Sequence, residues 1–171
     1  MTGGGPGGGS NDREGRIAGA DAALLFRVGR ESFAAPLAEV EEAVDVTALH
    51  ELPGATGALR GVVVVREALV PAYSAEAVLG ARAEAPATAL VIRRGDARLA
   101  LLVDDVIDVI AIPRDGLQPA PGGGMAGDVV VGVAPHGARL VALLDVGALV
   151  AALGGGQSVE GQGDVKPQET A

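Results

Sequence analysis

Two histidines, His50 and His136, are the only side chains that could serve as the usual general base for a serine or threonine nucleophile. His50 lies between acidic residues and a proline, which predicts a loop, and His136 lies in the segment APHGAR, which predicts a hairpin turn. Neither is accompanied by a catalytic motif, and a two-histidine metal site would require the two loops to converge. We interpret both as solvated loop histidines.

Three carboxylates, Asp104, Asp105 and Asp108, fall within five residues and could suggest a metal site or a general acid. The spacing lacks the glycine and the terminal glutamate of a calcium-binding loop. In an extended chain, adjacent side chains point to opposite faces, so Asp104 and Asp105 would not converge on one ion. The pattern favours a solvated strand edge or turn.

Other patterns also favour structure over chemistry. The glycine runs GGGPGGGS and PGGGMAGD are not followed by Lys-Ser/Thr, so they are typical of linkers and not of phosphate-binding loops. Arg93 and Arg94 are interpreted as a strand edge facing water and not as a ligand clamp. The chain has no cysteine, which removes thiolate chemistry and fits a reducing cytoplasm. The net charge of −9 argues against nucleic acid as a partner. We therefore predict no enzymatic activity, no metal site and no cofactor.

The ends of the 171-residue chain differ from its middle. Residues 1–20 contain no apolar stretch of the kind found in signal peptides and anchors, and residues 154–171 are polar and rich in glycine. Both are predicted to be disordered tails around one domain, residues 21–153. The apolar runs 62–65 and 99–103 end far short of the ~20 residues that span a bilayer.

The domain contains an internal repeat. With a shift of 66 residues, the segment ALLF at 23–26 matches ALVI at 89–92, Gly29 matches Gly95, and the similarity continues without a gap through Val46. After an insertion in the loop QPAPGGGMAGD, a shift of 71 aligns Gly61 with Gly132 and the segments that follow. Such self-similarity predicts two copies of one supersecondary unit.

Each copy is predicted to contain five short strands and one terminal helix, a pattern typical of a small β-barrel. In the first copy the strands are expected at residues 22–28, 32–35, 44–47, 61–65 and 69–73. Helices are expected at 75–79 and 146–153, capped by Ser74 and Asp145 and ended by Gly80 and Gly154. Gly29 and Gly95 are expected at hairpin turns that require positive φ. A barrel of ~65 residues is marginal alone, so the two halves should pack on each other.

The segment ELPGATGALRGVVVVREALVPAYSAEAVLG and the later run LALLVDDVIDVIAI followed by LQPAP resemble the CheW-like domain family. The positions that carry the resemblance are Leu52, Pro53, Gly54, Gly61, Val62, Val63, Arg66, Val70, Pro71, Val103, Asp104, Val106, Val109, Pro119, Gly132 and Val133. The resemblance extends from Ala22 to Leu153. It implies an all-β fold with short helices, built as two pseudo-symmetric, five-stranded, SH3-like β-barrel subdomains around a shared core.

The resemblance also implies a function. Proteins of this family are cytoplasmic adaptors that couple chemoreceptors (methyl-accepting chemotaxis proteins) to a CheA-type histidine kinase at membrane-associated arrays. One barrel binds the regulatory domain of the kinase, and the groove between the barrels binds the chemoreceptor cytoplasmic tip; no cofactor is involved. The partner-binding positions that carry over are Val40, Glu42, Gly61, Arg66, Val103, Val106 and Val109. Arg66 is the main candidate, because the valines suit a hydrophobic core equally well.

Four departures from the family pattern cluster near the predicted recognition segment. Val64 replaces the asparagine that is usual two residues before the arginine, and Glu67 replaces the glycine after it. Ser74 replaces an aspartate, and Thr56 replaces a proline. A non-glycine residue in a left-handed conformation costs roughly 1 to 2 kcal/mol, which predicts a rebuilt loop at Glu67. We therefore add Val64 and Glu67 to the candidate residues. The alternative function is a divergent paralogue that binds one partner and tunes or caps the array, and an enzyme with an unrecognised acidic site is the third hypothesis.

Overall fold

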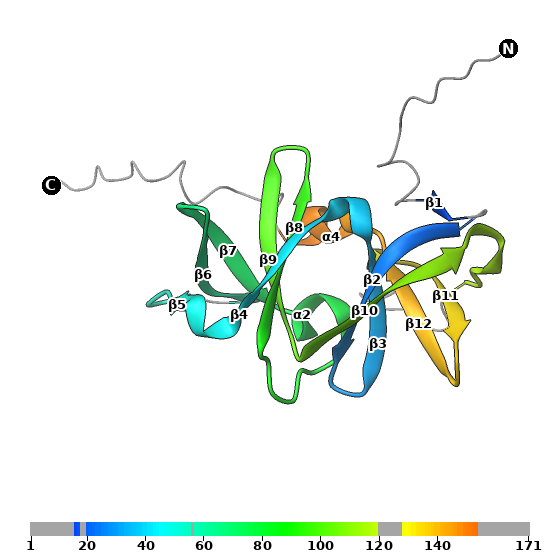
Figure 1. Cartoon of the computed structure of the whole chain (residues 1–171). Helices are drawn as coiled ribbons and strands as arrows, with labels where there is room; N and C mark the ends of the chain where they lie inside the picture. Colours follow the sequence, from blue (N-terminus) through cyan, green and yellow to red (C-terminus); the bar gives the residue numbers. More distant parts are fainter. Residues whose placement is uncertain (1–15, 18–19, 56, 120–127, 154–171) are drawn as a thin grey trace, which may run out of the picture.

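Most of the described chain is β-structure arranged in two curled sheets that lie side by side (Figure 1). The computed structural model describes residues 16–17, 20–55, 57–119 and 128–153. None of its described helices is both long and apolar enough to span a bilayer. The predicted tails lie outside the described residues, except that residues 16–17 form strand β1 and residue 20 begins β2.

Six strands form each sheet. Sheet A has the order β1-β2-β3-β12-β11, with β10 also paired to β2. Its strands are β1 (Arg16–Ile17), β2 (Ala20–Val28), β3 (Glu31–Pro36), β10 (Asp105–Pro113), β11 (Val130–His136) and β12 (Arg139–Leu144). Sheet B has the order β4-β8-β9-β7-β6-β5. Its strands are β4 (Val40–Asp45), β5 (Leu49–Glu51), β6 (Leu59–Val65), β7 (Ala68–Ser74), β8 (Thr88–Arg94) and β9 (Ala97–Val103).

The pairing registers confirm the internal repeat. The pair Phe26↔Phe33 in β2–β3 corresponds to Ile92↔Leu99 in β8–β9, which is the predicted shift of 66. The bulge between Val106 and Asp108 in β10 has its counterpart between Val40 and Glu42 in β4. Both sheets also contain one parallel pair, β12 with β3 and β7 with β9. The two sheets are therefore equivalent strand by strand, with β1 and β5 as the additional members.

The two sheets do not coincide with the two halves of the sequence. Strands β2 and β3 of the first half pair with β10–β12 of the second, and β4–β7 of the first half pair with β8 and β9 of the second. The chain crosses between the sheets twice, from β3 to β4 and from β9 to β10 (Figure 1). The prediction that each half folds as its own unit is therefore wrong, because the first two strands of each copy pair with the later strands of the other copy.

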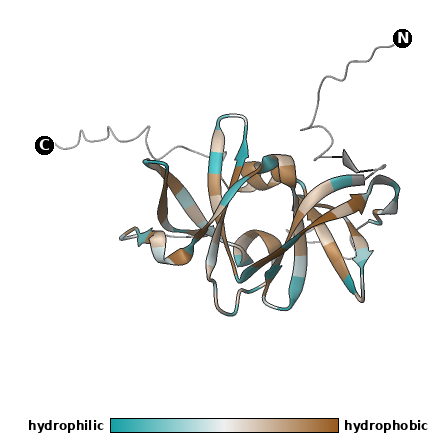
Figure 2. Cartoon of the chain, in the orientation of Figure 1, coloured by the Kyte–Doolittle hydropathy of each residue, from teal (hydrophilic) through white to brown (hydrophobic). Residues whose placement is uncertain are grey.

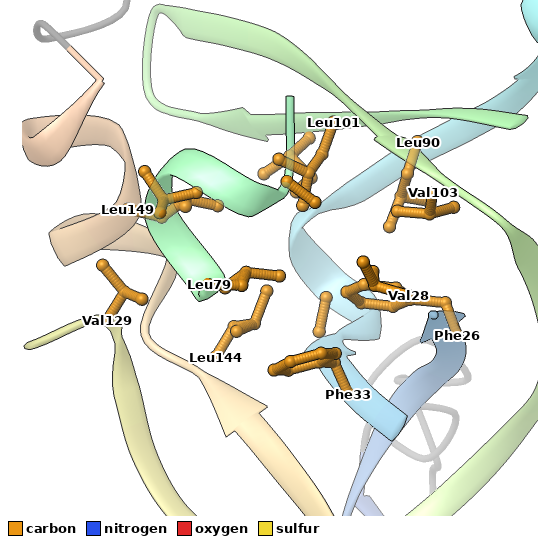
Figure 3. Close-up of a cluster of buried hydrophobic side chains, with 14 of the residues drawn as sticks. Phe26, Val28, Phe33, Leu79, Leu90, Leu101, Val103, Val129, Leu144 and Leu149 are labelled. Atoms are coloured by element: carbon orange, nitrogen blue, oxygen red, sulfur yellow. The ribbon is translucent and has the colours of Figure 1, made fainter. Parts of the chain in front are cut away.

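The main hydrophobic core lies between the sheets and includes the helices α2 (Glu76–Leu79) and α4 (Val146–Ala152). Figure 3 shows Phe26 and Phe33 from sheet A facing Leu90 and Leu101 from sheet B. Two smaller clusters, one for each sheet, fill the remaining interior. Successive side chains of a strand alternate between its faces, so β2 and β8 supply both the central core and a smaller cluster. This double burial explains their nearly continuous apolar sequences. Figure 2 shows hydrophilic ribbon at the tip of the β8–β9 hairpin and more hydrophobic ribbon toward the middle of the molecule.

The local predictions are largely confirmed. Gly29 and Gly95 both have φ of 62°, Gly80 ends α2 with φ of 73°, and the Asp145 carboxylate caps α4 by accepting from Ala148 N at 3.1 Å. Helix α2 begins at Glu76, one residue later than predicted, and its N-cap is Ala75 and not Ser74. The Ser74 hydroxyl still accepts from Glu76 N at 3.2 Å. The predicted strand 44–47 is displaced: β4 ends at Asp45, whose carboxylate caps the 3-10 turn η2 (Val46–Ala48). Gly154 lies outside the described residues.

Candidate partner-binding surface

Two of the predicted partner-binding residues, Glu42 and Arg66, contact each other. The Arg66 Nη2 and Nε atoms lie 2.9 Å and 3.1 Å from Glu42 Oε1. Glu42 belongs to β4, whereas Arg66 lies in the turn between β6 and β7, so tertiary structure brings them together. The side chain of Arg66 is 72% exposed and that of Glu42 is 28% exposed. The pair therefore presents a positioned guanidinium at the surface of sheet B.

The turn that carries Arg66 keeps a two-residue geometry. Val65 pairs with Ala68, and the two residues between them, Arg66 and Glu67, have φ of 52° and 70°. Two positive φ values match the type I′ turn, whose twist suits a β-hairpin. The prediction of a rebuilt loop at Glu67 is therefore wrong. The twist of β6 and β7 sets the turn geometry, and two side chains occupy a conformation that favours glycine or asparagine.

Apolar side chains flank this turn. Val64 and Leu69 are paired across β6 and β7, and they are 44% and 45% exposed. We call Val64, Arg66, Glu67 and Leu69 the hairpin patch. An exposed apolar pair beside a held arginine is a composition typical of protein interfaces.

A second group of predicted residues lies on the two crossing strands. Val40 in β4 and Val106 in β10 are equivalent in the repeat, and both are half-buried against the central core. Further along β10, Ile107 and Val109 are 46% and 49% exposed. We call Val40, Val106, Ile107 and Val109 the crossing-strand surface. Ile107 was not predicted, because it lies in a bulge that the sequence does not reveal.

Two other predicted residues are inaccessible. Val103 is fully buried in the central core (Figure 3), so any effect on a partner must be indirect. Gly61 is buried where β5 approaches β6, and a Cβ atom there would lie 2.3 Å from the carbonyl oxygen of His50. Its repeat mate Gly132 is in the same situation, 2.7 Å from the carbonyl oxygen of Gln118. These glycines are required by close backbone packing.

Glutamates along β4 and the turn before it form a row of ion pairs that the sequence did not indicate. Glu39 lies 2.5 Å from Arg94 Nη1, and Glu41 forms a bidentate pair with Arg98 at 2.9 Å for both contacts. Arg94 is exposed, as predicted, but its guanidinium forms an ion pair with Glu39. The partners are 55 and 57 residues apart in sequence, so only the strand pairing brings them together.

Asp104 corrects the prediction of a solvated acid, because its side chain is 5% exposed. Its Oδ2 atom accepts from Gly29 N at 2.5 Å and Glu84 N at 3.1 Å, and Oδ1 accepts from Ala85 N at 2.5 Å. Burial alone would raise the pKa of the carboxyl group, but these N–H donors and the charge of Arg27 outweigh it and lower the pKa. Asp104 therefore fastens the crossover between the sheets to the β2–β3 turn.

The remaining candidates for chemistry stay apart. Asp105 and Asp108 are exposed as predicted, and no three potential metal-ligating side chains gather within the described residues. His136 is exposed and ends β11 beside Gly137, whose φ of 64° confirms the predicted turn. His50 is exposed but lies in the short strand β5, so its prediction as a loop residue is wrong.

Comparisons with known proteins agree with this architecture. The model of the CheW-like domain matches residues 22–154. "Chemotaxis protein CheW" of Rhizobium meliloti (strain 1021) is 31% identical over 101 residues, which cover 57% of this chain and 65% of that protein. The scaffolding protein TtCheW from Thermoanaerobacter tengcongensis shares the fold, with a TM-score of 0.63 at 17% identity over 72% of this chain and 87% of that one. Since the family model spans the domain from β2 to α4, the chain belongs to the CheW-like domain family.

Proposed function

We propose that the protein is a chemotaxis adaptor that couples a chemoreceptor to a CheA-type histidine kinase through binding and not through catalysis. The hairpin patch is the docking site for the regulatory domain of the kinase. The crossing-strand surface is the docking site for the helical tip of the receptor. Both partners place the protein in the cytoplasm, at membrane-associated receptor arrays.

The Glu42–Arg66 pair is the observation that carries the kinase half of the proposal. An exposed arginine contributes most to binding when its geometry is fixed before the partner arrives, because less side-chain freedom is lost on association. Glu42 fixes Arg66 in this way, and Val64 and Leu69 provide the adjoining apolar area. A strand end with this composition suits the edge or end of another β-structure.

The receptor half depends on the exposed and half-buried side chains of the crossing strands. An amphipathic helix binds by laying its apolar face on a hydrophobic groove. Val40 and Val106 are half-buried near the starts of the two crossing strands, and Ile107 and Val109 add exposed apolar surface along β10. Receptor binding would therefore be centred away from the hairpin patch.

The alternative, an adaptor that binds only one partner, is favoured by Val64 and Glu67. A valine removes two donors and an acceptor that the usual asparagine would offer, and an acid adds charge where a glycine would add none. Because the turn keeps its hairpin geometry, these substitutions change the surface chemistry and not the backbone. The two functions differ in whether the kinase still binds.

The test is retention of purified partners at micromolar concentration. The full chain is expected to retain both a receptor tip fragment and the kinase regulatory domain. Arg66→Glu is expected to weaken kinase binding by tenfold or more while leaving receptor binding unchanged. Arg93→Glu, the same charge change at an exposed position on β8, is the matched control. Retention of the receptor alone by the unmodified chain would support the one-partner function instead, and retention of neither would refute both.

A further inference from the structure

A cavity of about 450 Å³ opens at one end of sheet A, away from the hairpin patch. Its apolar lining comes from three strands: Leu25 on β2, Val141 on β12 and Ile107 on β10. Leu25 and Val141 belong to the small core cluster of this sheet, so the cavity is the open end of that core. Its size falls within the range of roughly 300–1,000 Å³ typical of small-molecule sites.

The polar lining of the cavity is cationic. Arg27, Arg139 and His136 all contribute, and no carboxylate contributes among the described residues. Neither arginine forms an ion pair within the described part of the chain. Arg27 donates from Nη1 to the carbonyl oxygen of Gly29 at 2.8 Å, which positions its guanidinium and leaves its other N–H groups available.

Ser32 is a second, independent sign of a ligand. The residue lines the cavity and is 7% exposed as a whole, yet its hydroxyl has no hydrogen-bond partner among the described residues. Buried hydroxyl groups are normally hydrogen-bonded, because their desolvation is otherwise uncompensated. A group bound in the cavity would supply the missing partner.

The internal repeat shows what such a group should be. In sheet B the position of Ser32 is occupied by Arg98 and that of Ile107 by Glu41, and these two side chains form the bidentate ion pair at 2.9 Å. Arg93, the mate of Arg27, also donates to the carbonyl oxygen of its hairpin glycine, at 3.2 Å. Sheet B therefore contains its own carboxylate at this place. In sheet A this ion pair is absent, because Ser32 and Ile107 take the places of Arg98 and Glu41. Arg27 keeps the cation of Arg93, and Arg139 adds a second cation where sheet B has Ala68.

We propose that the open end of sheet A binds a small aliphatic carboxylate. The carboxylate accepts hydrogen bonds from Arg27, Arg139 and the Ser32 hydroxyl, and the alkyl chain packs against Leu25, Ile107 and Val141. The bound acid replaces the carboxylate that Glu41 supplies in the other sheet. The site is separate from the hairpin patch and shares Ile107 with the crossing-strand surface.

Titration of the full chain with hexanoate, followed by amide NMR shifts, tests the proposal. Saturable shifts centred on Ser32 and Val141 are expected at millimolar hexanoate, with hexanol at least tenfold weaker and hexylammonium inactive. Arg139→Gln, a change at an exposed position, is expected to weaken hexanoate binding about tenfold without altering the fold. Arg93→Gln in sheet B is the matched control and should leave binding unchanged.

A transplant of the sheet B pair gives the sharper test. The double variant Ser32→Arg/Ile107→Glu is expected to fill the cavity with its own ion pair and to abolish hexanoate binding, with a native-like spectrum elsewhere. The proposal is overturned by linear, non-saturating shifts, by equal binding of hexanol, or by full affinity in Arg139→Gln. These outcomes are independent of kinase or receptor binding.

Discussion

Replacing Asp104 by alanine is expected to destabilise the domain by about 4 kcal/mol. The carboxylate accepts three backbone N–H groups, of which that of Gly29 is buried and those of Glu84 and Ala85 belong to exposed residues. Losing the bond to the buried donor should cost about 2 kcal/mol, because that N–H cannot reach water. The other two donors can be hydrated and should cost about 1 kcal/mol each.

Asparagine at the same position separates the contributions of the two oxygens. The side-chain oxygen of Asp104→Asn can keep the bonds from Gly29 and Glu84, while its amide group opposes the N–H of Ala85. We expect a cost of about 2 kcal/mol for this variant. With an m-value of about 2 kcal/mol per molar urea, the midpoint should fall by about 1 M for asparagine and about 2 M for alanine. Asp105→Asn, an exposed neighbour, should change stability by less than about 0.5 kcal/mol.

The pH dependence follows from the lowered pKa of Asp104. Its contribution is complete above about pH 5, where the carboxyl group is ionised in both the folded and unfolded states. As the pH falls through the unfolded value of about 3.9, the unfolded chain takes up the proton first and the contribution declines toward the lower folded pKa. Urea unfolding between pH 7 and pH 3 measures the difference in unfolding free energy between wild type and Asp104→Asn. This difference should become smaller below about pH 4. A difference in unfolding free energy that stays constant with pH, or a destabilisation by Asp104→Ala of less than about 1 kcal/mol, would refute this reasoning.

Three further changes test the hairpin and the exchange of strands. Glu67→Gly should raise stability by about 0.5–1 kcal/mol in urea unfolding, because removal of a left-handed side chain outweighs the greater freedom of unfolded glycine; destabilisation would contradict this. Arg66→Glu should lower the free energy of unfolding by up to about 1 kcal/mol, and the exchange Glu42→Arg/Arg66→Glu should restore it without restoring kinase retention. If the exchange restored both, Arg66 would act only within the protein. Fragments 20–85 and 86–153 should each be unfolded or dimeric by circular dichroism and sedimentation, since neither contains a complete sheet; a folded monomer would contradict the exchange.

Local features of the fold could be predicted from the sequence because each depends on nearby residues. The short apolar runs between turn residues located most of the strands, and the glycines at 29 and 95 marked turns that the structure confirms. The exchange of strands could not be predicted, because side-chain periodicity gives the burial of a strand and not its neighbours. The burial of Asp104 was missed for the same reason, as its donors come from Gly29 and from the linker at Glu84 and Ala85.

The candidate site was only partly predictable. The resemblance to the family identified Glu42 and Arg66, and the structure shows that they form an ion pair. The resemblance also pointed to Val103 and Gly61, which the structure buries where a partner cannot reach them. A hydrophobic residue at a strand position can belong to the core or to an interface, and only the fold decides which. The cavity in sheet A has no sequence signature, because its residues come from five strands, β2, β3, β10, β11 and β12.

The repeat also indicates why the hairpin patch keeps a strained backbone. At the equivalent turn in sheet A, Gly137 occupies the position of Arg66, with φ of 64° against 52°. Glycine adopts this conformation without steric cost, and Ala138, the mate of Glu67, does not have positive φ, so the second copy contains no left-handed side chain at this turn. In the first copy a side chain is held there despite the cost, and it is the one that pairs with Glu42. Strain retained at one of two otherwise equivalent positions is typical of functional sites, and it supports Arg66 as the centre of the docking surface.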